Sequence, residues 1–294
     1  MERRQHTGPL LILLAGTFWG SMGLFVRALN TLGFSSAHVA CLRLAVGAVI
    51  FLLLLLVTGQ RPRMIRLRDV PLFLGLGLGS VLSFTMCYFR AIQLMPLATA
   101  AILLYTAPIW VTIMSALFFR EKLTGRKLLA LALAFSGCVL VSGLSAGALS
   151  PAALAFGLGS GVGYALYSIL GTLALRRYPP LTVTAWTFLF AALGALPVCD
   201  VPGLFAVTAA APAAAVAWLI PGTALITAVI PYLAYTKGLR GTEPGRASIL
   251  ATVEPVVAAL LGAAVYREMP TIPALLGIAL VLAAIVLLSV PGRK

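Results

Sequence analysis

The sequence predicts an all-α integral membrane protein with ten transmembrane helices, arranged as two inverted five-helix repeats. Composition is the first observation: 61% of the 294 residues are hydrophobic, 10% are charged, and the mean hydropathy is +1.07. A soluble domain is nearer half apolar and a quarter charged. The second observation is a series of apolar runs of membrane-spanning length, and the third is an internal repeat.

Ten apolar runs of roughly 20 residues follow one another, each able to cross a hydrocarbon core of about 30 Å. We expect the first to be a span, because it is too long for a cleaved signal peptide and no small-residue cleavage site follows it. The connections between the runs are short, so no second, soluble domain is expected. The predicted spans lie near residues 10–30, 36–58, 70–92, 96–119, 125–144, 152–175, 181–199, 213–236, 244–266 and 271–290.

The second half of the chain repeats the first. Residues 88–140 align with 235–287 without a gap at an offset of 147, and the earlier spans correspond more weakly at an offset of 145. An odd number of spans, duplicated head to tail, must enter the membrane in opposite senses, which relates the halves by an in-plane pseudo-two-fold axis. The matched pairs include Tyr88 with Tyr235, Pro108 with Pro255, Arg120-Glu121 with Arg267-Glu268, Trp19 with Tyr164, and Ala40 with Ala185.

The repeat predicts the domain organisation. We expect a first five-helix repeat at 10–144, a linker at 145–151 and a second, inverted five-helix repeat at 152–290, flanked by cytoplasmic segments at 1–9 and 291–294. The Arg-Glu pairs after the fourth and ninth spans are expected to set the turns that follow by local ion pairing.

Basic residues are distributed unequally between the two membrane faces. The face that carries both termini receives 17 of the 21 Lys and Arg residues, which predicts cytoplasmic termini by the positive-inside rule. The net charge of +14 therefore reflects topology and lipid-headgroup contact, and no nucleic-acid partner is expected. The 17 residues are Arg3, Arg4, Arg61, Arg63, Arg66, Arg68, Arg120, Lys122, Arg126, Lys127, Arg176, Arg177, Lys237, Arg240, Arg246, Arg293 and Lys294.

Sequence signatures of catalysis and of metal binding are missing. There is no HExxH motif, no Walker loop and no intramembrane aspartate pair. The four cysteines lie within or at the end of apolar runs, without metal-ligand spacing. We therefore expect no enzyme activity, no cofactor and no metal; the cysteines are Cys41, Cys87, Cys138 and Cys199.

Polar and aromatic residues cluster at mid-span depth, deeper than the interfacial belts where Trp and Tyr usually lie. A cavity that excludes ionic cargo and accepts planar amphipathic molecules would be lined in this way, and core packing is the alternative for each residue. The candidates for substrate contact are Trp19, Ser83, Phe84, Tyr105, Trp110, Tyr164, Tyr167, Ser168, Thr227, Tyr232 and Thr252.

Two pairs of repeat-related residues are candidates for hinges or gates. Pro108 and Pro255 occupy the middle of the fourth and ninth spans, where proline removes a backbone hydrogen bond and kinks the helix. Such kinks open a cavity at mid-membrane depth or only optimise packing. Tyr88 and Tyr235 end the third and eighth spans at opposite mouths, where they would act as gates or as interfacial anchors.

Three ionisable residues lie in or near the membrane: His38, Arg43 and Glu254. Burying a charge at bilayer centre costs at least about 2.5–3.5 kcal/mol, so such residues face the protein interior and need a partner. Arg43 would form an ion pair, contact a backbone carbonyl or bind a substrate carboxylate. Glu254 would neutralise Arg43, bind a substrate amine or carry a proton, and His38 would be interfacial or take part in proton transfer.

The motifs together resemble a known family. Trp19-Gly20-Ser21 in the first span, Arg43 in the second, Pro108 followed by Glu121, and Glu254-Pro255 followed by Glu268 resemble the duplicated EamA module of the drug/metabolite transporter superfamily, over residues 8–290. The resemblance implies a central cavity lined by spans one, three, four, six, eight and nine, with spans five and ten peripheral. Within the family, the chain is most similar to aromatic amino-acid exporters of the YddG type. Ala107 occupies the position that matches Glu254, so a mechanism with two symmetric carboxylates is not expected.

These observations predict a secondary transporter of the bacterial inner membrane that exports small amphipathic metabolites, in particular amino acids including aromatic ones, by alternating access. The outward direction follows from the resemblance alone. The transport mechanism is either proton coupling or facilitated diffusion, and the oligomeric state is either a monomer or a homodimer. One alternative is an exporter of hydrophobic drugs or other metabolites. Another is a polytopic membrane enzyme acting on lipid, which would need a His/Asp/Glu cluster at one interface.

Overall fold

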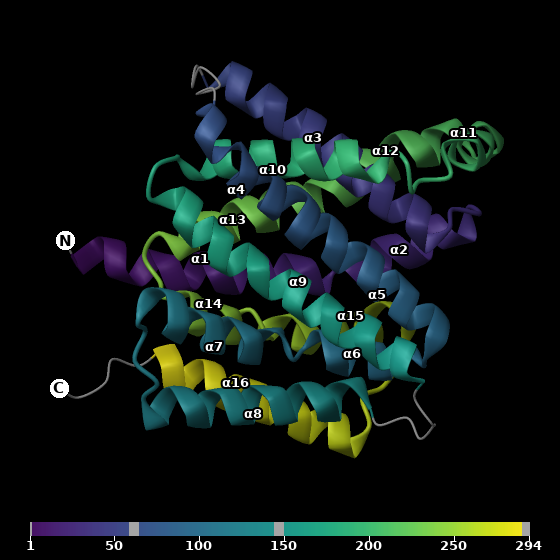
Figure 1. The fold of residues 1–294 in the computed structure, drawn as a ribbon. Helices are drawn as coiled ribbons and strands as arrows, with labels where there is room; N and C mark the ends of the chain where they lie inside the picture. The colour runs from purple at the N-terminus through teal and green to yellow at the C-terminus, as the bar shows by residue number, and fades with distance from the viewer. Residues whose placement is uncertain (1, 59–64, 144–149, 290–294) are drawn as a thin grey trace.

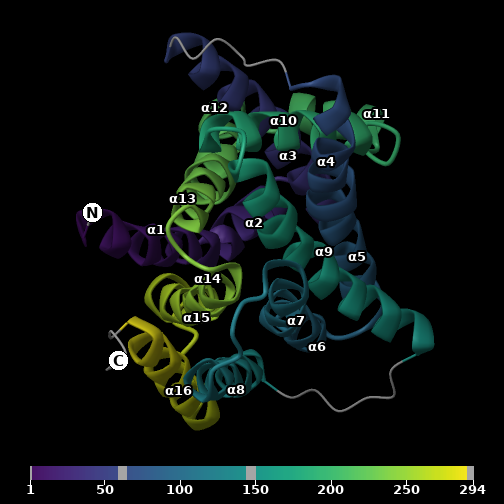
Figure 2. The same cartoon turned by 60° about the vertical axis from the view of Figure 1, so that its left-hand side comes forward.

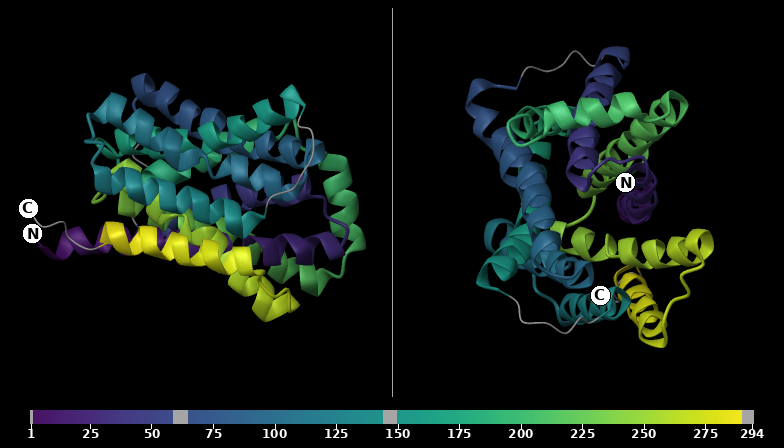
Figure 3. Two further views of the ribbon diagram at one scale, coloured as in Figure 1. Left: turned by 90° about the horizontal axis from the view of Figure 1, so that it is seen from below. Right: turned by 90° about the vertical axis from the view of Figure 1, so that its right-hand side faces the viewer.

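The computed structural model describes residues 2–58, 65–143 and 150–289, with side chains from residue 7 onward. All regular structure in these ranges is helical, which confirms the predicted fold class (Figure 1). The predicted tail at 291–294, most of the predicted linker at 145–151, and the basic residues Arg61, Arg63, Arg293 and Lys294 lie outside the described residues. The start of α1 and the end of α16 lie at the same end of the bundle (Figure 3). We call this end the terminal face and the opposite end the distal face.

The first repeat contains five membrane-crossing segments, three of which are interrupted. The first span is α1 (Glu2–Gly20) followed by α2 (Met22–Thr31), and the second is α3 (Ser36–Val57). The third runs through a short 3₁₀ turn (Leu67–Asp69), α4 (Val70–Leu74), a π-helical stretch (Gly75–Leu82) and α5 (Ser83–Leu94). The fourth is α6 (Leu97–Leu104) with α7 (Ala107–Phe119), and the fifth is α8 (Gly125–Ser142).

The second repeat has the same order with one addition. Its spans are α9 (Pro151–Leu175); α10 (Pro180–Ala195); α12 (Ala213–Ala224), a π-helical stretch (Leu225–Val229) and α13 (Ile230–Leu239); α14 (Pro244–Leu250) with α15 (Val253–Tyr266); and α16 (Ile272–Ser289). The added helix is α11 (Val201–Ala210), which lies across the distal end of the bundle (Figure 3).

Nine of the ten segments in the described chain are long and apolar enough to cross a membrane. The exception is α10, predicted at 181–199, which has 16 residues and a length of about 24 Å. The chain after α10 turns and enters α11, whose first turn is capped by the Asp200 carboxylate through the backbone N–H of Gly203 at 3.1 Å. An apolar ten-residue stretch is too short to span, so hydropathy did not predict α11 as a separate element.

The fourth and ninth spans are interrupted at equivalent places, just before Pro108 and Pro255. Proline lacks the N–H that would continue the helical ladder. The hydroxyl groups of Thr106 and Thr252 donate to the carbonyls of Leu103 and Ile249, each at 2.6 Å, which satisfies acceptors near each break. The π-helical stretches of the third and eighth spans also match, because 75–82 corresponds to 222–229 at the repeat offset. Irregular turns of this kind often occur at functional sites.

Spans five and ten pack together at the periphery, as the family resemblance implies. Figure 2 shows α8 and α16 side by side, away from the centre of the bundle. Their close approach depends on Gly137 and Gly277: a Cβ at either position would lie within 2.7 Å of the other residue's carbonyl oxygen. Small residues at such crossings let transmembrane helices pack backbone to backbone.

The terminal half of the bundle is packed more tightly than the distal half. All but one of the residues of α14 are buried, as are most of those of α13, whereas α11 has no buried residue and α15 has two. At the terminal face, α7 packs against α14. Toward the distal face, α6 packs on α5, α8 and α9, while α15 packs on α1, α2, α8 and α16. The fourth and ninth spans therefore contact each other mainly on the terminal side, through α7 and α14.

Candidate functional site

Arg43 of α3 is a buried cation in the middle of the bundle. Its Nη2 donates a hydrogen bond to the backbone carbonyl of Thr227 at 3.0 Å, and its Nε has no hydrogen-bond partner. Thr227 lies in the π-helical stretch of the eighth span, where the widened turn presents a carbonyl to the side chain. Of the three roles expected for Arg43, the structure shows the carbonyl contact. That single contact leaves most of the guanidinium donors available.

Glu254 lies in the first turn of α15, directly after the break in the ninth span. The N-terminal end of a helix favours a negative charge. Within the described chain, no hydrogen bond to the Glu254 carboxylate forms, and the ion pairs within 4.0 Å involve other residues. Arg43 and Glu254 are nevertheless near enough to interact electrostatically. The two side chains thus lie in the protein interior without forming an ion pair with each other.

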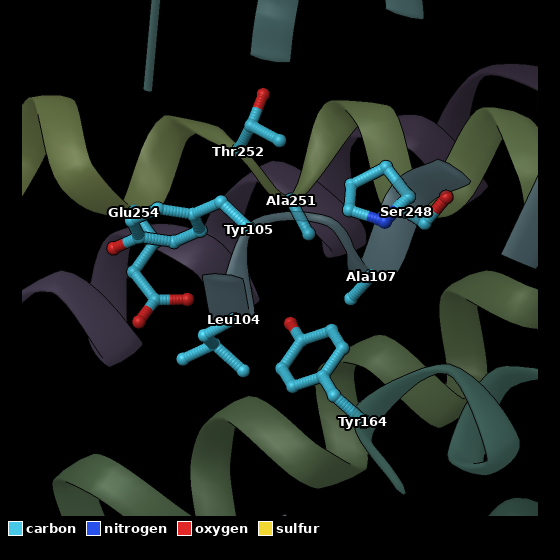
Figure 4. A pocket seen from close by; sticks show the side chains of 9 residues that line it. Leu104, Tyr105, Ala107, Tyr164, Ser248, Ala251, Thr252 and Glu254 are labelled. Atoms are coloured by element: carbon cyan, nitrogen blue, oxygen red, sulfur yellow. The ribbon is translucent and has the colours of Figure 1, made fainter. Parts of the chain in front are cut away.

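A first cavity lies beside Glu254, between the fourth span, the ninth span and α9 (Figure 4). The hydroxyl of Tyr164 points from α9 toward this space, with Ser248 and Ala251 coming from α14 and its end. Three pairs of lining residues are repeat partners, 147 positions apart, so the cavity lies on the pseudo-two-fold axis. These pairs are Leu104 with Ala251, Tyr105 with Thr252, and Ala107 with Glu254.

A second cavity is enclosed by aromatic side chains from spans one, three, six and eight. Trp19 is central to it, with ring centroids 6.0 Å from Tyr164, 5.3 Å from Tyr232 and 5.4 Å from Tyr235. Hydrogen bonds hold two of the tyrosines in place: Tyr167 with Thr236 at 2.7 Å, and Tyr235 with Ser168 at 2.8 Å. We call the set Trp19, Phe84, Tyr164, Tyr167, Tyr232 and Tyr235 the aromatic cage.

A third cavity lies beside Arg43 and completes a row of three. Tyr164 lines both the first and the second cavity, while Val81, Phe84 and Tyr232 line both the second and the third. The row therefore runs from Glu254 through the aromatic cage to Arg43. Each of the three cavities has room for about one water molecule in this conformation. A substrate larger than water must displace side chains to enter.

The row of cavities brings together most of the sequence-predicted site residues. Lining it are Trp19, Arg43, Phe84, Tyr105, Pro108, Tyr164, Tyr167, Ser168, Tyr232, Tyr235, Thr252 and Glu254. Tyr235 was expected near a mouth of the pathway. It lies instead in the aromatic cage and is 1% exposed, while its role as a gate stays a prediction.

Other candidates lie outside the row. Trp110 donates its indole N–H to the Thr106 hydroxyl at 3.1 Å, and Tyr88 stacks on Phe84 with ring centroids 6.3 Å apart. His38 caps the first turn of α3 with Ser35, and its Nε2 lies 3.8 Å from the Asp200 carboxylate at the distal face. None of the cavities is lined by Ser83, Thr227 or Pro255, although the Thr227 carbonyl holds Arg43.

Several lining residues were not predicted because they are small or apolar. Ser80, Val81 and Phe188 are ordinary core residues by composition, and their role depends on which cavity they face. The internal repeat does contain a signal for others. Because Leu104 and Ala107 are repeat partners of Ala251 and Glu254, aligning the halves around Glu254 would have identified them.

A buried ion-pair network lies at the terminal face, after the fourth span. Glu121 pairs with Lys127 and accepts hydrogen bonds from the Ser115 hydroxyl and, at 3.2 Å, from the backbone N–H of Gly245. Lys127 also pairs with Glu243 at 3.0 Å. Because Glu243 and Gly245 begin α14, the network joins the two repeats, and we call these five residues the terminal latch. Burial acts to raise the pKa of Glu121, but its hydrogen bonds with Lys127 and Ser115 hold that pKa below its ordinary value.

The same backbone turn recurs after the ninth span, at the distal face. Arg120 and Arg267 both have left-handed backbones, with φ of 54° and 58°, which is uncommon for residues other than glycine. Glu268, however, pairs with Arg27 of α2 at 2.6 Å, and this hydrogen bond lowers the pKa of Glu268. The predicted local Arg-Glu pairs do not form at either turn. Each glutamate reaches another helix instead, and only the terminal-face network is buried.

Residues 6–143 and 151–290 each match the model of the EamA-like transporter family. The chain belongs to the EamA-like transporter family. This EamA-like transporter is therefore a multi-pass membrane protein and a transporter, as the resemblance of its motifs indicated.

Relatives of this EamA-like transporter support the assignment along its whole length. An uncharacterized transporter of Archaeoglobus fulgidus is 29% identical over 286 residues, covering 97% of both chains. The uncharacterized inner membrane transporter YicL of Salmonella typhimurium is 26% identical over 294 residues, covering 98% of this chain and 96% of the relative. The pseudopaline exporter CntI of Pseudomonas aeruginosa is 32% identical over 117 residues, covering 40% of this chain and 39% of the exporter. A solved crystal structure shares the fold, with a TM-score of 0.73 at 20% identity and 95% of each chain aligned.

Proposed function

We propose that this EamA-like transporter exports small amphipathic metabolites, in particular amino acids including aromatic ones, by alternating access of its two inverted repeats. The observation that carries the proposal is the row of three cavities between Glu254 and Arg43, with the aromatic cage at its centre. Aromatic walls favour planar or apolar side chains, and the two charges suit a molecule with polar ends.

The position of the first cavity supports alternating access. It lies on the pseudo-two-fold axis, between spans four and nine, which are both interrupted there. In transporters built from inverted repeats, substrate sites lie near the midplane at the repeat interface and often involve discontinuous helices. Tilting of the repeats about this point would open the row toward one face or the other.

The outward direction and the location in a bacterial inner membrane with cytoplasmic termini are parts of the same proposal. Two relatives support them by name: YicL is an inner membrane transporter, and CntI is an exporter. The distribution of Lys and Arg supports the orientation. Hydrophobic drugs or other metabolites are the second candidate cargo, favoured by the aromatic cage.

The test is uptake and counterflow in proteoliposomes with labelled phenylalanine or tryptophan, a panel of unlabelled competitors, and an imposed or absent proton gradient. Saturable flux that is competed by amino acids supports the proposal, and its response to the gradient distinguishes proton coupling from facilitated diffusion. Flux equal to that of empty liposomes for every amino acid would reject the amino-acid assignment. Hydrophobic drugs or other metabolites would then be the preferred candidate cargo.

A further inference from the structure

We propose that the row of cavities is a zwitterion site, in which Arg43 binds the carboxylate of the substrate and Glu254 binds its ammonium group. This inference rests on the proposed transport of amino acids and specifies how the site recognises them. The substrate must then carry both charges on one molecule, and it binds in a single orientation.

The Arg43 end is built to receive an anion. The side chain lines the third cavity, donates one hydrogen bond to a backbone carbonyl and has a buried, unpartnered Nε. A guanidinium carries five N–H donors in a planar fork that matches a carboxylate with two parallel hydrogen bonds. A buried donor without an acceptor costs free energy, and a substrate carboxylate would remove that cost.

The Glu254 end has the complementary character. Its carboxylate lines the first cavity with Tyr105 and Tyr164, and it accepts no hydrogen bond from the described residues. The aromatic rings nearby offer an additional favourable surface to a bound cation. An ammonium group would thus find a carboxylate and two aromatic rings at this end.

The aromatic cage connects the cavity beside Glu254 with the cavity beside Arg43. Trp19 packs against both Tyr164, which lines the Glu254 cavity, and Tyr232, which lines the Arg43 cavity. Glu254 and Arg43 thus line cavities that share these aromatic walls, and they form no ion pair with each other. A molecule that carries both opposite charges can satisfy the two ends at once, while its side chain lies against the rings.

The internal repeat shows that the two charges are a single asymmetric set. At the offset of 147, Glu254 corresponds to Ala107, which lines the same first cavity. At the offset of 145, Arg43 corresponds to Phe188, which lines the same third cavity. Each charge therefore faces an apolar repeat partner. The pseudo-two-fold axis does not generate a second copy of the site, so a zwitterion can bind in only one orientation.

The experiment compares ligands that lack one charge. Counterflow of labelled phenylalanine in proteoliposomes is competed with phenylalanine, with its amide (no carboxylate) and with N-acetylphenylalanine (no ammonium). We expect both derivatives to compete at least about tenfold more weakly than phenylalanine, because each loses a charge-assisted interaction. This comparison uses the wild-type protein and does not depend on any variant folding.

Variants assign each charge to its residue. In Arg43→Gln, the preference for phenylalanine over its amide should disappear while the preference over N-acetylphenylalanine remains; Glu254→Gln should show the reverse. Arg43→Lys keeps the positive charge and should keep part of the discrimination. The control is Arg90→Gln, which removes an exposed arginine bonded to Gln93 and should change neither preference.

The outcomes separate this inference from the proposed function. Phenylalanine flux that is equally competed by all three ligands overturns the zwitterion site and leaves amino-acid transport standing. If Glu254→Gln keeps its discrimination for the ammonium group and loses only its response to a proton gradient, Glu254 carries a proton and the assignment of the ammonium to it is wrong. If no amino acid is transported and none raises the melting temperature of the purified protein, both proposals fail.

Discussion

Replacing Glu121 with glutamine is expected to open the terminal face. The substitution keeps the size of the side chain but removes the charge that pairs with Lys127 and accepts the Gly245 N–H. The Lys127 pair lies within the first repeat, whereas the Gly245 N–H, at the start of α14, loses a charged acceptor, so a contact between the two repeats is weakened. The terminal latch should therefore release, and the cavity beside Ser248 should become reachable from the terminal face.

The size of the effect follows from the burial of the pair. The Glu121 and Lys127 side chains are 4% and 7% exposed, and removing one charge of a buried pair costs about 3–5 kcal/mol. Glu243, which is 64% exposed, stays beside Lys127 and keeps part of its stabilisation. We therefore expect the lower end, about 3 kcal/mol, which shifts the equilibrium between closed and open terminal faces by about 100-fold.

The assay measures labelling of Ser248→Cys by a membrane-impermeant maleimide applied to the terminal face. The native cysteines, Cys41, Cys87, Cys138 and Cys199, are first replaced by alanine. Glu121→Gln should raise the labelling rate by up to about 100-fold. Glu268→Gln is the matched control, because it makes the same change at the repeat-equivalent turn of the distal face. Equal labelling rates in parent and Glu121→Gln, with both proteins folded, would refute the reasoning.

Three further predictions concern acidification, the aromatic cage and the peripheral helices. Because the pKa of Glu121 is lowered on folding, the latch contributes fully above about pH 4.5 and is lost as the pH falls through the lowered value. The ratio of Ser248→Cys labelling in the parent to that in Glu121→Gln, measured at the same pH so that thiol ionisation cancels, should rise on acidification, and a constant ratio would contradict this. Trp19→Ala should lower amino-acid counterflow at least about tenfold, since Trp19 contacts three tyrosines of the cage. The control, Trp218→Ala, changes an exposed residue and should leave counterflow unchanged. Equal losses in the two variants would contradict the cage assignment. Gly137→Ala should destabilise the protein by about 1–3 kcal/mol, because its Cβ would meet the Gly277 backbone. The control is Gly125→Ala in the same helix, whose added Cβ would meet no atom within 4 Å. Equal melting temperatures for the two variants would be inconsistent with that packing.

Much of the candidate site was predictable because proline, charged and aromatic residues are rare at mid-membrane depth. Pro108 and Pro255 indicated where two spans are interrupted, and Trp19, Tyr164, Arg43 and Glu254 indicated what gathers there. Ser80, Val81 and Phe188 were not predictable, because a small or apolar residue looks the same in a sequence whether it faces a cavity, a helix or lipid.

The sequence by itself determined the number of spans, their approximate limits and the inverted relation of the two halves, because hydropathy and repetition are local properties of the chain. Only the tertiary structure decided which groups each charge meets. Arg43 contacts a carbonyl of the eighth span, Glu121 reaches α14, and Glu268 reaches α2, although Glu121 and Glu268 follow identical turns. The reason is that two repeats with the same local structure pack against different neighbours at the two faces. The terminal face thereby carries a buried ion-pair network and the distal face an exposed pair.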